Sequence, residues 1–185
     1  MNSFSTLSAV SASIPSRNAS MQRIIKGDQV VDETWHLLAK DVPLAEIPNS
    51  DDVIVPMQLW LEHAHALTAR DGGLGIWLEA DEAIEDIADD LEHFQVVALN
   101  FPVFTDGRHF SSARLLRERY GYKGEIRAIG DVLRDQLFLM RRCGFDAYAV
   151  RPDRDPYDAL EGLKDFSVTY QSAADDALPL FRRRG

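Results

Sequence analysis

Residues 104–114, FTDGRHFSSAR, bring one acid, two arginines, one histidine and two serines into eleven positions. The segment follows the apolar run VVALNFPVF and precedes the helix-like stretch LLRERY. A helix N-terminus carries free N–H groups and a partial positive charge, so it attracts anions. We therefore predict a site for a small oxyanion where this strand passes into a helix.

Five side chains supply the donors that such a site needs. Arg108 and Arg114 add charged donors around the segment, and Ser111 or Ser112 is expected to cap the helix. Arg151, from a later loop, is expected to complete the set. The alternative is a plain surface turn, because Asp-Gly is a common turn, serine is a common cap and arginines mostly lie in water.

Three residues in the same region suit acid–base chemistry. An unperturbed histidine titrates near pH ~6.5, so His109 is the candidate acid or base, with Asp106 or Asp131 as its partner. Asp131 directly precedes an expected helix, so a structural N-cap is its alternative role. His63 and His65 are two residues apart on an expected helix and do not share a face, and we predict no metal site.

The single cysteine limits the redox chemistry of the chain. Cys143 alone excludes an intramolecular disulfide, a CxxC pair and a cysteine-ligated iron–sulfur cluster within one chain. A reducing, cytoplasmic setting is expected. Residues 71–75, DGGLG, precede a strand and lack both phosphate-binding fingerprints, so we predict no nucleotide loop there. The cofactor, if any, stays unidentified.

Apolar runs alternate with amphipathic segments along most of the chain. The expected strands are DVIVP (52–56), LGIWLEA (74–80), QVVALNF (95–101), EIRAIG (125–130), DAYAV (146–150) and a last strand FSVTY (166–170). The expected helices are residues 56–70, 81–94, 111–120, 131–144 and 155–163. Residues 23–31, RIIKGDQVV, predict an N-terminal β-hairpin around a Gly-Asp turn.

This alternation predicts an α/β fold made of repeated right-handed βα units. The sheet is expected to be mainly parallel with five or six strands, too few for a complete eight-stranded barrel. A doubly wound sheet and a partial barrel are the two candidates. In both, ligands bind beyond the carboxyl ends of the strands, where Glu79, Asn100, Asp131 and Arg151 are expected to share one rim.

The length of 185 residues suits one domain. We predict a disordered, Ser-rich tail at residues 1–20, a single α/β domain at 21–172 and a frayed tail at 173–185. Met21 is an alternative to Met1 as the native start, because organised sequence begins directly after it. No stretch approaches the ~20 apolar residues of a membrane-spanning helix, so no membrane association is expected.

The net charge of −10 is unevenly distributed. Residues 106–154 hold eleven Lys or Arg against seven Asp or Glu, hence +4, which leaves −14 for the rest of the chain. Residues 79–92 hold eight acids and no base. Overall acidity argues against nucleic-acid binding. The acidic helix either solvates an outer face or docks a basic partner.

Residues 100–151 also carry a resemblance, most visible in FTDGRHFS, GDVLRDQL and MRRCGFDA. Over roughly residues 24–170 the chain resembles a bacterial family of unknown function labelled probable oxidoreductase of sulfite reduction, whose members are encoded beside the assimilatory sulfite reductase haemoprotein. The resemblance implies a cytoplasmic role at the six-electron step from sulfite to sulfide. The implied partner is sulfite reductase or its electron donor. The resemblance itself identifies no catalytic residues.

Three functions are therefore open. The first is an accessory protein in assimilatory sulfite reduction that assists electron delivery to sulfite reductase through docking and a small-anion site. The second is a cofactor-free enzyme that acts on a phosphate- or sulfur-bearing metabolite through the histidine and acids named above. The third is a non-catalytic structural partner.

Overall fold

The computed structural model describes residues 22–164, which form one eight-stranded sheet with helices packed on it. The strands are β1 (Arg23–Lys26), β2 (Gln29–Asp32), β3 (His36–Leu37), β4 (Val53–Pro56), β5 (Leu74–Leu78), β6 (Val96–Phe101), β7 (Glu125–Gly130) and β8 (Ala147–Tyr148). The α-helices are α1 (Met57–Thr68), α2 (Arg108–Arg114), α3 (Arg134–Cys143) and α4 (Pro156–Glu161). The 3-10 segments are η1 (Leu44–Glu46), η2 (Ile84–His93) and η4 (Gly162–Lys164), and η3 (Leu115–Arg119) is π-helical.

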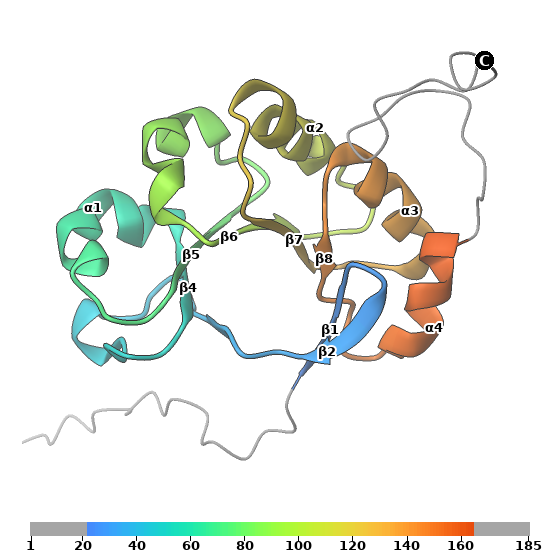
Figure 1. Ribbon diagram of the computed structural model, residues 1–185, viewed down its shortest axis with the longest axis horizontal. Coiled ribbons are helices and arrows are strands. Elements are labelled where there is room, and N and C mark those ends of the chain that lie inside the picture. Colours follow the sequence, from blue (N-terminus) through green and yellow to red (C-terminus); the bar gives the residue numbers. More distant parts are fainter. Residues whose placement is uncertain (1–21, 165–185) are drawn as a thin grey trace, which may run out of the picture.

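The strand order is β2-β1-β8-β7-β6-β5-β4-β3. Strands β3 to β8 are parallel and follow one another in chain order, whereas β1 runs antiparallel to both β2 and β8. The sheet therefore curls into a half-barrel, with the helices arched over one face (Figure 1). The mixed α/β prediction is confirmed. The expected number of strands was wrong, because β1 and β2 join the same sheet and β3 is too short to show a periodic pattern.

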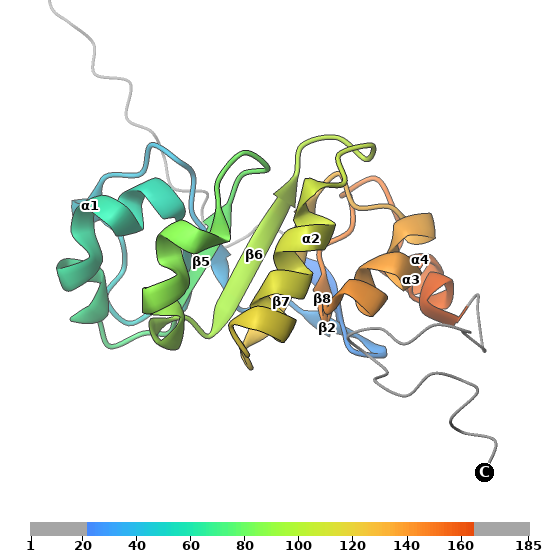
Figure 2. The ribbon, with the colours of Figure 1, turned by 90° about the horizontal axis from the view of Figure 1, so that it is seen from above.

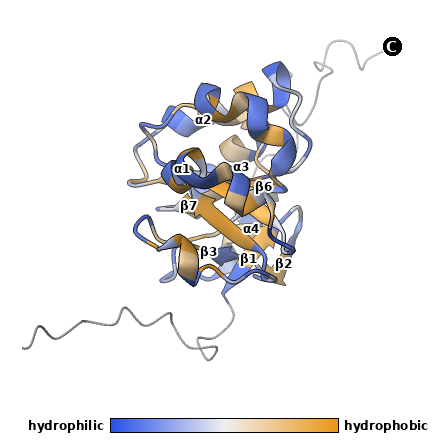
Figure 3. Ribbon diagram, turned by 90° about the vertical axis from the view of Figure 1, so that its left-hand side faces the viewer, coloured by the Kyte–Doolittle hydropathy of each residue, from blue (hydrophilic) through white to orange (hydrophobic). Residues whose placement is uncertain are grey.

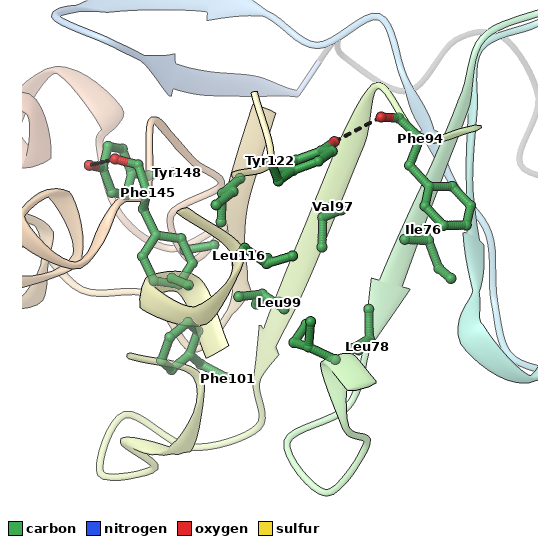
Figure 4. Packing of buried hydrophobic residues seen from close by; sticks show 14 of the residues in the cluster. Ile76, Leu78, Phe94, Val97, Leu99, Phe101, Leu116, Tyr122, Phe145 and Tyr148 are labelled. Atoms are coloured by element: carbon green, nitrogen blue, oxygen red, sulfur yellow. Dashed lines mark hydrogen bonds between the residues drawn. The ribbon is translucent and has the colours of Figure 1, made fainter. Parts of the chain in front are cut away.

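The helices cover the convex face side by side (Figure 2). Alternate residues of the central strands point into this layer, among them Ile76 and Leu78 of β5 and Val97 and Leu99 of β6 (Figure 4). Each of these four side chains is fully buried. This alternation follows from the two-residue period of a strand and places most of the apolar core between sheet and helices.

Buried tyrosines on the convex side keep their hydroxyl groups paired. The hydroxyl of Tyr122 donates to the carbonyl of Phe94 at 2.9 Å, and that of Tyr148 donates to the carbonyl of Phe145 at 3.0 Å (Figure 4). An unpaired hydroxyl would cost about 1–3 kcal/mol in such surroundings. Both bonds therefore let large aromatic rings fill the core without a polar penalty.

The concave face holds a second, smaller apolar cluster. Its buried members are Ile54, Trp77, Val96, Ala98 and Ile129, with Trp35 and Ala149 packed against them. Gly75 leaves room on this face, since a Cβ there would lie 3.0 Å from the carbonyl oxygen of Val96. Figure 3 shows the apolar strands enclosed between the helices and the β1–β3 region.

A three-residue connector joins the two edges of the sheet. Strand β2 lies at one edge and β3 at the other, and only residues 33–35 separate them in the chain. Eight flat strands would place these edges about 34 Å apart, from seven spacings of about 4.8 Å. Four Cα steps span at most about 15 Å. The sheet must therefore curl until the connector can cross its concave face.

Buried ion pairs hold this connector against the middle of the sheet. Arg127 of β7, only 3% exposed, donates to Glu33 of the connector and pairs with Glu125 at 2.6 Å. Glu125 in turn meets Lys26 of β1 at 2.6 Å. One buried guanidinium thus links the connector, β7 and β1.

Two helical segments differ from expectation. The acidic segment forms the 3-10 helix η2 (Ile84–His93), with Ile84, Ile87 and Leu91 buried beneath it. The helix expected over residues 111–120 begins three residues earlier, at Arg108, and continues as the π-helical η3. The expected strand 166–170 and the tails 1–20 and 173–185 lie outside the described residues. Within residues 22–164, no helix is both long and apolar enough to cross a membrane.

Removal of the buried guanidinium should destabilise the fold. We expect Arg127→Met to lower the free energy of unfolding by about 3–5 kcal/mol, because it leaves two buried carboxylates poorly compensated. Urea denaturation measures this change. The control Arg23→Met breaks an exposed ion pair with Asp32 (3.6 Å) and should cost under about 1 kcal/mol. Equal losses in the two variants would contradict the role given to Arg127.

Candidate functional site

The loops after β5, β6, β7 and β8 form the rim at the carboxyl ends of the parallel strands. Figure 2 shows the loops after β5 and β6 extending from the same edge of the sheet. The expected rim residues Glu79, Asn100, Asp131 and Arg151 lie on these strands or within three residues of their ends. Their contacts form two groups, one at the mouth of the half-barrel and one beside α3.

The group at the mouth links the segment after β3 to the carboxyl ends of β5 and β6. Glu79 meets the ammonium of Lys40 at 2.9 Å and accepts a hydrogen bond from the side chain of Asn100 at 2.7 Å. Burial raises the pKa of Glu79, but the bonds from Lys40 and Asn100 outweigh it and the net pKa is lowered. Lys40 also lies over the Trp77 ring, 5.8 Å from its centre. Glu79 is thus held as a carboxylate.

Gly130 permits the Asn100 side chain to sit at the mouth. Its φ of 90° lies in the left-handed region, which glycine adopts without strain. A Cβ at this position would come within 2.4 Å of the Asn100 amide oxygen. The end of β7 therefore needs glycine for two independent reasons.

The second group is centred on Asp131. One carboxylate oxygen accepts the backbone N–H of Phe104 at 2.9 Å, and the other accepts from Arg151 at 3.1 Å. The loops after β6, β7 and β8 therefore meet at one carboxylate. The alternative role of Asp131 as a helix N-cap was wrong, because Leu133 is the N-cap residue of α3. The backbone N–H of Leu133 donates to the side-chain oxygen of Gln136 at 3.2 Å.

Each rim guanidinium is already paired with a carboxylate. Arg151 binds Asp153 with two bonds of 2.9 and 2.8 Å. Arg108 binds Asp106 with bonds of 3.0 and 2.6 Å, and the Arg108 backbone N–H adds a third contact at 3.2 Å. These hydrogen bonds lower the pKa of Asp106 to about 2. An incoming anion must therefore compete with internal carboxylates for either arginine.

His109 is buried, with 1% of its surface exposed. Its Nδ1 lies 3.2 Å from the Ser112 hydroxyl, its ring packs against Phe101, and its Nε2 has no partner of hydrogen-bonding geometry. Burial lowers the pKa of His109, partly opposed by the backbone of Leu78 and by Asp106. In this structure the imidazole cannot reach a solvent-borne substrate.

Both serines and Arg114 lie in helix α2, where the Ser112 hydroxyl is beside the buried His109. Helix α2 has Gly107 as its N-cap residue and no side-chain cap, so the capping role expected for Ser111 or Ser112 was wrong. Both serines lie inside the helix because it starts at Arg108. Arg114 forms an i,i+4 ion pair with Glu118 at 3.1 Å. Beside Arg114, a shallow pocket of about 430 Å³ is lined by α2 and η3 residues.

A larger pocket lies at the opposite, amino ends of the strands. It measures about 480 Å³, and its lining includes Trp35, Lys26, Glu125 and Lys123. Lys26 and Glu125 are already paired there. Within residues 22–164, no group of three or more His, Cys, Asp or Glu is placed to hold a metal ion.

Two contributors to the rim were not predicted. Lys40 lies in an irregular segment with no periodic pattern, and nothing in the sequence connects it with Glu79. Gln136 donates its side-chain amide to the carbonyl of Phe104 at 2.5 Å while it caps α3. Gln136 lies three residues after the N-cap residue Leu133, but leucine has no side-chain acceptor, so the sequence carries no capping-box motif there.

Comparison with known proteins identifies a family. A family model described as a bacterial protein of unknown function (DUF934) matches residues 75–181. No curated protein and no solved structure matches the chain.

The buried imidazole should make stability depend on pH. Because the folded pKa of His109 is lowered, the unfolded chain binds more protons, and stability falls as pH drops below about 6.5. We expect His109→Gln to flatten the change in unfolding free energy between about pH 7.5 and 5.5. Urea titrations at each pH measure it.

An exposed histidine on α1 provides the control. His65→Gln removes an exposed imidazole and leaves the buried one in place, so it isolates the effect of burial at His109. A His109→Gln curve parallel to that of wild type would contradict the assignment. Asp106, whose pKa is about 2, titrates well below this window, whereas burial raises the pKa of Asp146, a contribution common to wild type and both variants.

Proposed function

The chain belongs to the bacterial family DUF934, and we propose that it is a cytoplasmic accessory protein of assimilatory sulfite reduction. In this proposal it docks on sulfite reductase or on the donor that supplies its electrons. The resemblance of residues 100–151 to a family labelled for sulfite reduction motivates the pathway. The observation that supports docking is an exposed acidic surface on η2 whose carboxylates form no ion pair within the described residues.

We define the acidic face as the five exposed carboxylates on and before η2. They are Asp81, Glu85, Asp86, Asp89 and Glu92. None of them forms an ion pair within residues 22–164. Like charges this close repel one another, and a basic partner surface would relieve that repulsion.

Packing beneath the acidic face keeps its charges together. Asp90, on the same segment, accepts a hydrogen bond from the Trp60 indole at 2.9 Å, and the Trp60 ring stacks edge-on against Phe94 at 4.7 Å. These contacts hold η2 against α1. The acidic face is therefore a fixed surface whose field can steer an approaching partner.

The proposal includes a weak anion site at the rim. Arg108 and Arg151 are its cations, and Asp106 and Asp153 are their internal competitors. A sulfite or sulfate ion, or a partner carboxylate, would exchange with one of these aspartates. Such exchange conserves most of the charge pairing, so the site is expected to bind weakly and reversibly.

Growth of a deletion strain tests the pathway. We expect growth on sulfide but not on sulfite as sole sulfur source, because the defect lies at sulfite reduction. Complementation with the intact gene restores growth on sulfite and serves as the control. Equal growth of the deletion strain on both sources would contradict the proposed function.

Charge reversal on the acidic face tests steering. The double variant Asp86→Lys, Asp89→Lys should associate with the purified haemoprotein or donor about tenfold more slowly at ~0.05 M salt, and the difference should shrink by ~0.5 M salt. Stopped-flow or surface binding measures the rates. The control Glu46→Lys, Asp41→Lys makes the same charge change on exposed residues elsewhere. An equal loss in both variants would attribute the effect to net charge alone.

Removal of an internal competitor tests the anion site. We expect Asp153→Ala to bind sulfite several-fold more tightly than wild type, because it releases two donors of Arg151. Arg151→Ala should bind more weakly than wild type. Isothermal titration with sulfite measures both, and Asp28→Ala, at an exposed ion pair with Arg141, is the control. Unchanged affinity in Asp153→Ala would exclude Arg151 as the anion ligand.

A further inference from the structure

We infer that the loop after β6 is a short-range docking point for a protein partner. In this arrangement Phe104 enters an apolar pocket of that partner, and Arg108 and Arg151 face carboxylates at the pocket's edge. The inference deepens the proposed function and rests on it for the partner's role. It concerns a different surface from the acidic face.

The tip of this loop presents apolar side chains to solvent. Phe104 is 53% exposed and the preceding Val103 is 51% exposed. Together with Pro102 they form a contiguous apolar tip at the rim. Single exposed apolar residues are ordinary, but an exposed aromatic beside a second apolar side chain and two arginines has the composition of a binding hot spot.

The backbone of the tip is fixed by three hydrogen bonds. The N–H of Phe104 donates to Asp131 at 2.9 Å, and its carbonyl accepts from Gln136 at 2.5 Å. The N–H of Asp106 closes the turn on the carbonyl of Val103 at 3.0 Å. The backbone that carries the exposed ring is thus held in place before any partner arrives, which reduces the entropy lost on binding.

Charge around the tip favours an acidic surrounding on the partner. The side chains of Arg108 and Arg151 are 57% and 38% exposed, whereas those of their partners Asp106 and Asp131 are 11% and 22% exposed. The guanidinium groups therefore face outward and the carboxylates inward. Asp153, 54% exposed, offsets part of the charge of Arg151 and would yield to a partner carboxylate.

An exposed aromatic ring beside two outward-facing guanidinium groups fits a protein surface better than a small anion. An oxyanion would use the guanidinium donors and leave the ring of Phe104 in water. A protein pocket edged by carboxylates accommodates both features, because it buries the Phe104 ring and pairs the two arginines. A basic pocket would be repelled by the outward arginines.

Photo-crosslinking tests this surface in the intact protein. The photoreactive residue p-benzoylphenylalanine replaces Phe104, and in matched controls it replaces Leu139 or Tyr157, which are 52% and 53% exposed. Cells are irradiated and the crosslinked peptide is mapped by mass spectrometry. We expect an adduct from position 104 and not from the controls, attached to an apolar segment that contains Asp or Glu. It should fall at least about tenfold when Arg108→Glu and Arg151→Glu are added.

Folding is controlled separately. Arg151→Glu removes a contact to Asp131, so Arg108→Glu, which breaks the pair with Asp106 alone, is also tested by itself. Thermal unfolding of each variant identifies any loss of structure. Absence of an adduct from position 104, an adduct insensitive to Arg108→Glu in a folded protein, or an adduct to a second copy of this chain would overturn the inference.

The outcome separates this inference from the proposed function. A charge-dependent adduct to a protein outside sulfite reduction would support the docking point and contradict the proposed pathway. Conversely, binding of purified haemoprotein or donor that is unchanged in Phe104→Ala would leave the proposed function intact and overturn the docking point. Loss of that binding in Phe104→Ala, with the acidic face unaltered, supports both.

Discussion

The structure depends on the three residues that join the two edges of its sheet. A connector this short forbids a flat sheet and requires a curled one, with the helices on the convex face and the connector across the concave face. That crossing places Glu33 beside Arg127 in the middle of the sheet and inserts Trp35 among the concave apolar residues. Because burial of these charges is costly without a partner, the ion pairs hold the curvature that brings them together.

Curvature also determines which rim residues meet. The carboxyl ends of β6, β7 and β8 converge, so one carboxylate, Asp131, can bind the loop after β6 and an arginine after β8. At the other end of the rim β3 pairs with β4, and the segment that follows β3 brings Lys40 over the mouth to Glu79. The rim is therefore cross-braced by internal ion pairs, and its arginines are oriented before any ligand binds.

The sequence predicted best where a regular period extends over several residues. Strands β4 to β7 and the helices α1 and α3 follow from their apolar spacing, and the rim residues Glu79 and Asn100 follow from the ends of those strands. The two-residue β3 has no period to detect, and the pairing of Lys40 depends on a path through space. Arg108 and Arg151 were expected to await an anion, because spacing along the chain does not reveal that Asp106 and Asp153 already occupy them.

The acidic face and the apolar, arginine-flanked Phe104 tip suit two successive stages of the proposed association, the approach of a partner and its contact. In the proposed docking, the acidic face would act through charge alone, over the ~8–10 Å at which salt permits exposed charges to interact. The Phe104 tip would act only at contact, where removal of an aromatic ring and of guanidinium groups from water decides how long a complex lasts. Asp81, at the start of the acidic face, is among the carboxylates that raise the pKa of Arg108, so the field of the acidic face reaches this arginine. In the proposed association, a partner steered by the acidic face would therefore arrive near the Phe104 tip, where a charged encounter can become a packed interface.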